Sequence, residues 1–352
     1  MKNYAGRRVF VTGGLGFIGS NLTIRLVQLG ARVTVVDSLV AGCGGNRRNL
    51  RPVANDVEVI EADAGAVELL RPYLRRAETI FNLAGEVSHS HSMEFPERDL
   101  EINVCSQMAF VRECAAQAPG VRIVYAGTRQ VYGRPQYLPV DENHPLAPVD
   151  FNGIHKLAAS QYHLVLSDAG QLDAVVLRLT NVYGPRLALN IPCQGVLAVF
   201  FARVLLGERA EVFGDGTQLR DPVYVDDAVD ALLRAGSVAK PASRTYNVGG
   251  PRALSLKAIA NTISEAGGAL PPLFRPFPYE LSQIDIGSFY ANCERIGREL
   301  GWQPAVQLED GVARTFDFFR RHLRDYLKPG CGYPQCELRP SLRVQDRTEA
   351  TA

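Results

Sequence analysis

A glycine-rich turn constrains the fold of this chain more than any other feature. The turn is Thr12–Gly19, with the sequence TGGLGFIG. It follows residues 8–11 (RVFV), which predict a strand, and precedes residues 20–27, whose apolar positions recur at helical spacing. Glycines allow a tight turn and close backbone approach, and the N–H groups at a helix start bind phosphate. The combination predicts a site for the pyrophosphate of a dinucleotide.

A carboxylate at the end of the next strand refines this prediction. Residues 31–36 (ARVTVV) predict a second strand, and Asp37 follows at the spacing expected for a carboxylate on the adenosine ribose. A 2′-phosphate would meet a like charge there, so Asp37 favours NAD; a cap on the following loop is the alternative. Arg47 and Arg48 leave NADP open.

Charge and cysteine content exclude several classes of protein. The chain has 38 Lys and Arg against 37 Asp and Glu, so no global charge favours nucleic acid or an anionic membrane. The apolar runs are too short to span a bilayer, and no apolar segment precedes the first strand, so we expect a cytoplasmic enzyme. Seven cysteines do not make a disulfide framework. The close pair Cys331 and Cys336 lacks further clustered ligands, so we predict no metal site.

Alternating strand and helix patterns predict an α/β fold with a doubly wound parallel sheet. Glycine-rich residues 41–46 are expected to fold over the adenosine, and the pattern loosens beyond residue 185 before residues 223–235 return as a helix to the first domain. The polar, aperiodic residues 326–352 predict a tail. Further strands are expected at 57–63, 78–85, 121–126 and 174–179, and long helices at 100–118 and 152–167.

Several further motifs occur in order along the chain. They are Asn82–Gly85 (NLAG), Val131–Gly133 (VYG), Asn181–Pro185 (NVYGP), Gly214–Gly216 (GDG), Arg220-Asp221 and Tyr224–Asp227 (YVDD). With the glycine turn and Asp37, they make residues 7–320 resemble the extended short-chain dehydrogenase/reductase family, the NAD-dependent nucleotide-sugar epimerases and dehydratases.

The resemblance implies a division of the chain and a homodimer. Residues 1–180, with about 218–248, would form the NAD-binding Rossmann domain. Residues of about 181–217 and 249–325 would form a smaller mixed C-terminal domain for a nucleotide-diphosphate sugar. Two protomers would pack through the two long helices.

The resemblance also implies which residues hold NAD. They lie at the glycine turn, at strand ends and on the predicted helices: Gly13, Gly16, Phe17, Ile18, Gly19, Asp37, Ser38, Asp63, Ala64, Leu83, Ala84, Gly85, Asn103, Lys156 and Tyr183.

In the family, a Ser or Thr three residues before Val-Tyr-Gly hydrogen-bonds the sugar hydroxyl that is oxidised. Thr128 occupies that position. A hydroxyl both donates and accepts, so it suits a group that alternates between alcohol and ketone. The alternative is a strand-end threonine that caps the following turn.

The family's Tyr-x-x-x-Lys element is incomplete in this chain. The spacing places both side chains on one helical face, where the lysine holds the nicotinamide ribose and the tyrosine removes the hydroxyl proton. Lys156 is present, but the tyrosine position is Asn152. An amide has no useful acid/base pKa, so the route of the proton is open.

Three interpretations of this substitution follow. In the first, the base has moved, and the candidates are Glu86, His89 and His91, which follow the fourth predicted strand. Histidine suits the part because it titrates near neutrality, although both histidines also fit a packing or surface-loop role. In the second, Thr128 and an ordered water form a weaker relay. In the third, the chain binds NAD and a sugar without redox turnover.

The remaining residues favour relocated chemistry over lost chemistry. Thr128, Lys156 and the cofactor motifs are all present. His155 ranks lower as a base because, one position from Lys156 on the helix, it is expected to face elsewhere.

Two residues after Thr128 bear on the reaction type. Family members that eliminate water commonly place Asp-Glu there, whereas this chain has Arg129 and Gln130, which cannot act as base and acid at neutral pH. Ordinary 4,6-dehydration is therefore disfavoured. Arg129 is expected to meet a substrate carboxylate or phosphate, or else to form a surface salt bridge.

The resemblance assigns the substrate diphosphate to Asn181 and Arg220, and an arginine fork suits two phosphates. The predicted function is NAD-dependent epimerisation of a nucleotide-diphosphate sugar, at C4, through a transient keto intermediate. The alternatives are an oxidoreductase or a dehydratase or decarboxylase acting through a 4-keto sugar, and a non-catalytic NAD-bound sensor or partner subunit.

Overall fold

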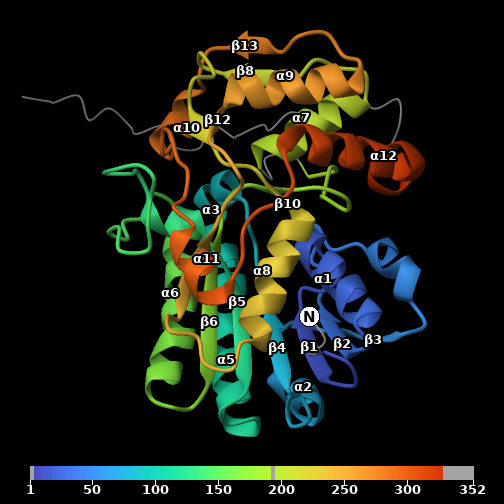
Figure 1. Ribbon diagram of the computed structural model, residues 1–352, viewed down its shortest axis with the longest axis vertical. Helices are drawn as coiled ribbons and strands as arrows, with labels where there is room; N and C mark the ends of the chain where they lie inside the picture. Colours follow the sequence, from blue (N-terminus) through green and yellow to red (C-terminus); the bar gives the residue numbers. More distant parts are fainter. Residues whose placement is uncertain (1–3, 192–194, 328–352) are drawn as a thin grey trace, which may run out of the picture.

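The computed structural model describes residues 4–191 and 195–327, so Cys331, Cys336 and most of the predicted tail lie outside the described residues. Its centre is a seven-stranded sheet with the order β11-β6-β5-β4-β1-β2-β3 (Figure 1). Every neighbouring pair is parallel, which confirms the predicted doubly wound α/β fold. The strands are β1 (Arg8–Thr12), β2 (Arg32–Asp37), β3 (Val57–Glu61), β4 (Thr79–Asn82), β5 (Arg122–Thr128), β6 (Asp173–Leu179) and β11 (Thr245–Val248).

The order of the strands reverses between β1 and β4, which places a crevice at their carboxyl ends. The middle positions of the central strands are apolar and buried on both faces, as expected for a sheet that helices cover on both sides. In β1, Val9 and Val11 belong to one core cluster and Phe10 to the cluster on the opposite face.

On one face, α1 (Phe17–Gln28) packs beside α8 (Val225–Ser237), although the two helices are far apart in sequence. Residues of α8 therefore share one core cluster with α1 and with strands from the first half of the chain. Buried Trp302 extends this core and donates its indole N–H to the backbone oxygen of Asp227 at 2.9 Å.

The opposite face carries α2 (Val67–Leu74), α5 (Ser106–Gln117) and α6 (Phe151–Asp168). The single helix expected at 100–118 is wrong in detail. The structure has α4 (Pro96–Leu100), then a π-helical turn η2 (Glu101–Cys105), and then α5. In this wider turn Asn103 points inward, and its Nδ2 donates to the Glu86 carbonyl and to Asp99. A pattern of apolar residues does not predict such a polar contact.

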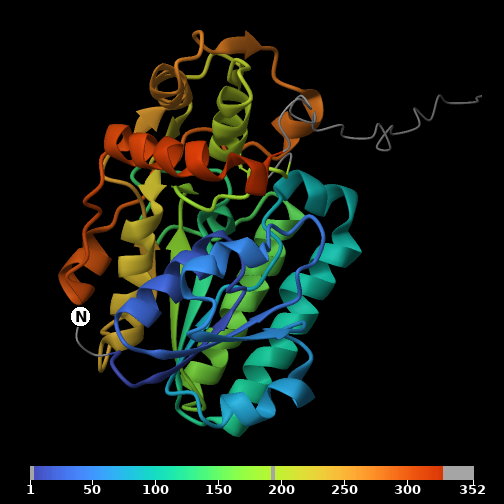
Figure 2. The same cartoon turned by 90° about the vertical axis from the view of Figure 1, so that its right-hand side faces the viewer.

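A second core lies above the carboxyl ends of the sheet (Figure 2). It is built mainly by α7 (Val196–Leu205), α9 (Leu256–Gly267) and α12 (Leu308–Tyr326). The predicted domain division at about residues 180, 218 and 248 stays a prediction. Within the described residues, each helix is too short or too polar to cross a bilayer.

Shorter elements complete the chain. They are η1 (Arg47–Val53), α3 (His89–Glu94), η3 (Arg129–Tyr132), β7 (Val182–Tyr183), β8 (Glu211–Phe213), β9 (Leu219–Arg220), β10 (Val223–Tyr224), β12 (Leu254–Ser255), β13 (Leu273–Arg275), α10 (Tyr279–Gln283) and α11 (Glu294–Leu300).

The Phe81 ring tests the packing of the central sheet. It is fully buried on β4 beside Tyr4, and a methyl group on Gly236 of α8 would lie 2.7 Å from it. We expect Phe81→Ala to lower the free energy of unfolding by about 3–5 kcal/mol through lost burial and a cavity. The matched control Phe274→Ala removes a ring that is 45% exposed and should cost only about 0.5 kcal/mol. Denaturant unfolding measures both values, and equal losses would contradict this packing.

Candidate active site

The glycine turn closes the crevice so tightly that side chains are excluded. Gly13 has φ +66°, and a Cβ there would lie 2.8 Å from the backbone of Leu83 and Ala84. A Cβ on Gly19 would lie 2.1 Å from the carbonyl oxygen of Gly13. Helix α1 starts directly after Gly16 without a side-chain cap, so its first N–H groups face the crevice as a phosphate site.

Thr12 joins the two strands that flank the crevice. Its hydroxyl donates to Asn82 Oδ1 at 2.7 Å and accepts from the N–H groups of Leu83 and Ala84, both at 3.1 Å. The ends of β1 and β4 are therefore held at a fixed spacing.

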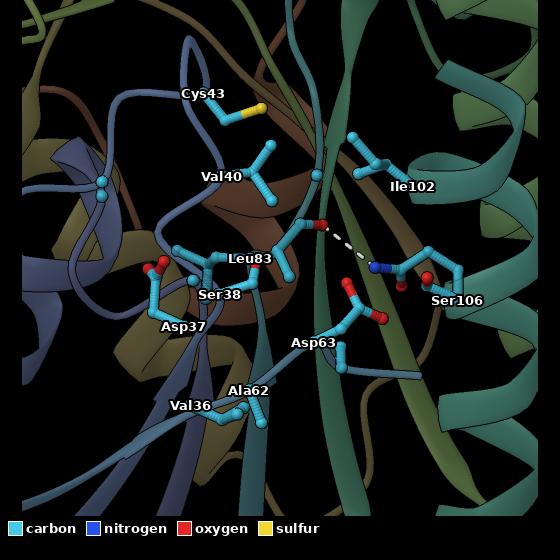
Figure 3. Close-up of a pocket in the computed structure, with 17 residues that line it drawn as sticks. Val36, Asp37, Ser38, Val40, Cys43, Ala62, Asp63, Leu83, Ile102 and Ser106 are labelled. Atoms are coloured by element: carbon cyan, nitrogen blue, oxygen red, sulfur yellow. Dashed lines mark hydrogen bonds between the residues drawn. The ribbon is translucent and has the colours of Figure 1, made fainter. Parts of the chain in front are cut away.

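A pocket opens beside this turn along the ends of β2 and β3 (Figure 3). The loop after Asp37 contributes Val40, Cys43 and Gly45, so part of the predicted glycine-rich segment does cover it. The predicted cofactor residues that line it are Gly13, Gly16, Asp37, Ser38, Asp63, Ala64, Leu83, Ala84 and Gly85.

Asp37 is oriented by two backbone groups. Its Oδ2 accepts from the N–H of Leu15 at 3.0 Å, and its Oδ1 accepts from the N–H of Leu39 at 2.9 Å. Burial raises the pKa of Asp37, while the two N–H groups act in the opposite direction. These two hydrogen bonds fix the Asp37 carboxylate in the lining of the pocket, where it could accept hydrogen bonds from an adenosine ribose.

A buried acceptor and a buried cation lie next to Gly85 at the end of β4. Asn103 Oδ1 is buried and has no hydrogen-bond partner in the described part of the chain. A Cβ on Gly85 would lie 2.1 Å from Lys156 Nζ and 2.6 Å from Asn103 Oδ1, so only glycine leaves this space open. Ribose hydroxyls both donate and accept, so these groups and the glycine cradle fit NAD.

Lys156 is buried, and burial lowers its pKa to about 8, although the negative charges of Asp99 and Glu86 act to raise it. Lys156 Nζ thus lies beside Gly85 at the end of β4, and its contact with the nicotinamide ribose stays a prediction.

Asn152 is also buried, and its side chain is held by two acceptors. Its Nδ2 donates to the Glu86 carbonyl at 3.0 Å and to Asp99 Oδ2 at 2.9 Å. Its backbone N–H donates to Ser92 Oγ at 3.1 Å. Asn152 thus fixes the start of α6 against the loop that follows β4.

Asp99 is the centre of this polar network. Its Oδ1 contacts His155 Nδ1 at 2.7 Å and accepts from Asn103 Nδ2 at 3.0 Å. His155 therefore points toward the carboxylate that also holds Asn152, and the expectation that it faces elsewhere is wrong. Positions three apart on a helix share a side, so Asn152 and His155 reach one acceptor.

Thr128 ends β5 and caps the turn η3, as its alternative interpretation states. Its hydroxyl oxygen accepts from the N–H of Gln130 at 3.2 Å, which leaves the hydroxyl proton free to donate. Arg129 lies 5.2 Å from the centre of the Phe289 ring, and burial lowers its pKa to about 9. It is not the surface residue of the alternative interpretation.

The three proposed bases, Glu86, His89 and His91, have different surroundings. Glu86 Oε2 accepts from Cys43 Sγ at 2.9 Å, and its Oε1 accepts from the N–H groups of Val87 and Ser88. His91 packs against Phe95, with ring centres 4.8 Å apart. His89 lies 3.2 Å from Asp150.

The predicted diphosphate residues differ in their freedom to bind. Asn181 Oδ1 is buried without a partner in the described residues. Arg220 Nη1 donates to the carbonyl groups of Leu219 and Gly287, and Nη2 lies 3.8 Å from Asp285. Asp285 and Gly287 therefore help to hold the Arg220 guanidinium in place.

Three predicted cofactor residues lie in hydrophobic cores. Phe17 packs between the two main clusters and Ile18 packs on the first. The Tyr183 ring is fully buried against Phe201 and Tyr224 in the second core, and its hydroxyl donates to Leu308. The ring is thus a packing group, and only its backbone is left for a cofactor contact.

Asp99 and Asp150 are the site residues that sequence reasoning missed. Asp150 caps α6 by accepting from the N–H of Gly153 at 2.6 Å, and an Asp before a helical pattern is a recognisable signal. Nothing in the spacing of Asp99 marks it, because two of its partners, Asn152 and His155, come from the distant helix α6.

The sequence profile of the NAD dependent epimerase/dehydratase family matches residues 9–249. The match covers more than half of the chain, and the protein belongs to this family. It is therefore an enzyme of the nucleotide-sugar epimerase/dehydratase class, and its cofactor is NAD.

Particular relatives narrow the comparison. A UDP-glucose 4-epimerase from Mycolicibacterium smegmatis is 35% identical over 320 residues, which are 89% of this chain and 98% of that protein. The crystal structure of UDP-glucose 4-epimerase from Thermotoga maritima with UDP-glucose has a TM-score of 0.81 at 30% identity, covering 90% of this chain and 99% of that one. A UDP-glucuronic acid decarboxylase 1 from Xenopus tropicalis is 29% identical over 331 residues, 90% of this chain and 73% of that protein.

The Gly19 contact predicts the effect of one methyl group on cofactor binding. Gly19→Ala forces a Cβ onto the Gly13 carbonyl, and such overpacking costs about 1–3 kcal/mol, so NAD affinity should fall roughly 10- to 100-fold. The matched control is Gly297→Ala on α11, whose Cβ would lie 3.4 Å from the Trp302 carbonyl oxygen, and it should bind NAD like the parent protein. Calorimetric titration measures both, and an unchanged affinity for Gly19→Ala would refute the cradle.

Lys156 predicts a pH dependence of stability in protein stripped of NAD. Its folded pKa of about 8 lies below the ordinary 10.5, so between these values the unfolded state binds more protons and stability rises with pH. The shift corresponds to a destabilisation on the order of 3 kcal/mol at neutral pH.

Lys156→Met should therefore be more stable than the parent at neutral pH, and this advantage should vanish by about pH 10.5. Lys240→Met, which removes an exposed lysine, should follow the parent. Urea unfolding across this range checks the difference, and parallel curves for the two variants would contradict the buried charge.

Proposed function

We propose that this protein epimerises a nucleotide-diphosphate sugar at C4 through a transient ketone. The observation that carries the proposal is the meeting of Thr128, Lys156 and the NAD cradle at one sheet edge, without a carboxylate at positions 129 and 130. The similarity to UDP-glucose 4-epimerases over nearly the whole chain supports it.

In this proposal the chain's own residues bind and orient. NAD, when bound, supplies the acceptor for a hydride and later returns it. Thr128 donates its free hydroxyl proton to the oxygen of the reacting carbon, and Lys156 orients the nicotinamide ribose together with Asn103. Asn152 fixes the loop after β4 through Glu86 and leaves the proton acceptor to another group.

Asn181 and Arg220 would hold the diphosphate. The orphaned Asn181 oxygen needs a donor, which a sugar hydroxyl or an ordered water supplies, while its amide group faces phosphate. Arg220 is fixed by carbonyl groups and keeps a positive charge beside the phosphates.

A second candidate is oxidation of a sugar that carries a carboxylate, as in nucleotide-sugar decarboxylation. It is favoured by Arg129, a partly buried cation whose guanidinium bonds Gln130 and has no ion pair within 4.0 Å among the described residues. A uronate carboxyl group would neutralise it. The related decarboxylase from Xenopus tropicalis supports this candidate.

We also propose a homodimer through α5 and α6. Large apolar side chains stay exposed on these helices, with exposed fractions of 39% for Met108, 48% for Ile154 and 63% for Val165. Burying them against a second copy removes apolar surface from water.

The product distinguishes the candidates. Incubated with UDP-glucose in heavy water, the protein should give a mixture of UDP-glucose and UDP-galactose by proton NMR, with no deuterium at C5, because 4-epimerisation leaves C5 untouched. Deuterium at C5 would indicate dehydratase-type enolisation, and loss of carbon dioxide from UDP-glucuronate would establish the second candidate. No product and no reduced nicotinamide with a panel of nucleotide sugars would favour a sensor.

A further inference from the structure

The proton acceptor is the part of the site that Asn152 leaves unfilled. Its Nδ2 is occupied by the Glu86 carbonyl and Asp99, and an amide does not take up a proton at neutral pH. The base must therefore come from another segment that reaches the same sheet edge.

Three segments meet next to Asn152. His89 starts α3 after the β4 loop, Gln130 follows β5, and Asp150 precedes α6. Asp150 Oδ2 lies 3.2 Å from His89 Nδ1 and 3.0 Å from Gln130 Nε2. The backbone N–H of Gln130 donates to the Thr128 hydroxyl, so Gln130 connects Thr128 to Asp150 and His89.

The protonation of His89 follows from its surroundings. Gln130 Oε1 accepts from Arg129 Nη1 at 3.0 Å, so Gln130 turns its Nε2 toward Asp150. His89 Nδ1 faces the same carboxylate oxygen, and we infer that Nδ1 carries the proton, because a lone pair on Nδ1 would face a lone pair of the carboxylate. Gln130 Nε2 lies 3.3 Å from His89 Nδ1 and donates to that same oxygen. His89 Nε2 is then the accepting nitrogen of the neutral ring.

Asp150 is built to support that role. Its side chain is 1% exposed, whereas that of His89 is 35% exposed, so the carboxylate is fixed inside and the ring reaches outward. Burial acts to raise the pKa of Asp150, but His89 and the N–H of Gly153 outweigh it and hold the pKa below its ordinary value. The carboxylate stays ionised and can stabilise a protonated imidazole.

The other candidates fit less well. Both oxygens of Glu86 already accept hydrogen bonds. His91 packs on Phe95, and no carboxylate lies within ion-pair distance of it in the described part of the chain. His155 is 11% exposed and lies in the buried network of Asp99, which also holds Asn152.

We propose that His89, oriented by Asp150, is the acid/base that replaces the missing tyrosine; this rests on the proposed epimerisation. The hydroxyl proton passes to His89 Nε2 as the carbon gives up its hydride to the nicotinamide, and the C–O bond becomes a carbonyl. In the return step the hydride goes back to the other face of the carbon, and His89 returns the proton to the oxygen. No other reactant is consumed.

The first test is spectroscopic and needs neither NAD nor substrate. In protein with ¹⁵N-labelled histidine, the His89 ring should show a protonated Nδ1 and an unprotonated Nε2 at neutral pH. In Asp150→Asn, which keeps a helix-capping side chain, the Nε2-protonated tautomer should gain population. A protonated Nε2 in the parent protein, or an Asp150→Asn spectrum identical to it, would overturn the pairing.

The second test is kinetic and uses the holoenzyme with its nucleotide sugar. His89→Gln should lower kcat by roughly 10²- to 10⁴-fold at unchanged NAD affinity, the range for loss of a general base. Added imidazole should restore part of the activity of His89→Ala. His322→Gln, which removes an exposed histidine on α12, should match the parent.

The outcomes distinguish the assignment of His89 as the base from the proposed epimerase function. If the parent protein interconverts the sugars and His89→Gln does so equally fast, the assignment of the base is wrong while the proposed function stands. A loss confined to His155→Gln would move the base to the Asp99 pair. If the parent protein converts no nucleotide sugar, the proposed function itself fails.

Discussion

The backbone of β1 passes so close to the backbone that follows β4 that no side chain fits between them. Gly13 lies against Leu83 and Ala84, Gly19 lies against Gly13, and Thr12 ties the two segments by hydrogen bonds. This contact sets the position of α1, and hence of the phosphate site at its start. It also sets the direction in which the β4 loop leaves the sheet, which decides where Glu86 meets Asn152 and where His89 meets Asp150.

The substitution at position 152 is integrated into the fold. Asn152, Asn103 and His155 all contact the buried carboxylate of Asp99. A buried carboxylate is stable only when several donors surround it, so these residues form a set that must be considered together. Asn152 therefore has a structural role at the start of α6.

The sequence predicts the parts of this protein that depend on local pattern. The strands through β6 carry β-branched runs, and the glycine turn and Asp37 have a fixed spacing, so the sheet, the cofactor and the adenosine pocket could be predicted. The π-helical turn at Glu101–Cys105 could not, because one extra residue per turn leaves no clear trace in an apolar pattern. The burial of the Tyr183 ring and the partners of His155 depend on contacts between distant segments, which spacing along one helix does not encode.

The loop over the pocket at Asp37 is held at two points. Burial raises the pKa of Cys43 to about 12, so its thiol keeps the proton that it donates to Glu86, and Arg98 binds the Ala41 carbonyl at 2.6 Å. A cofactor bound under this loop would exchange slowly with solution. Such slow exchange would burden an enzyme that must trade spent cofactor for fresh after each cycle, but it suits one that regenerates its own oxidant on the spot.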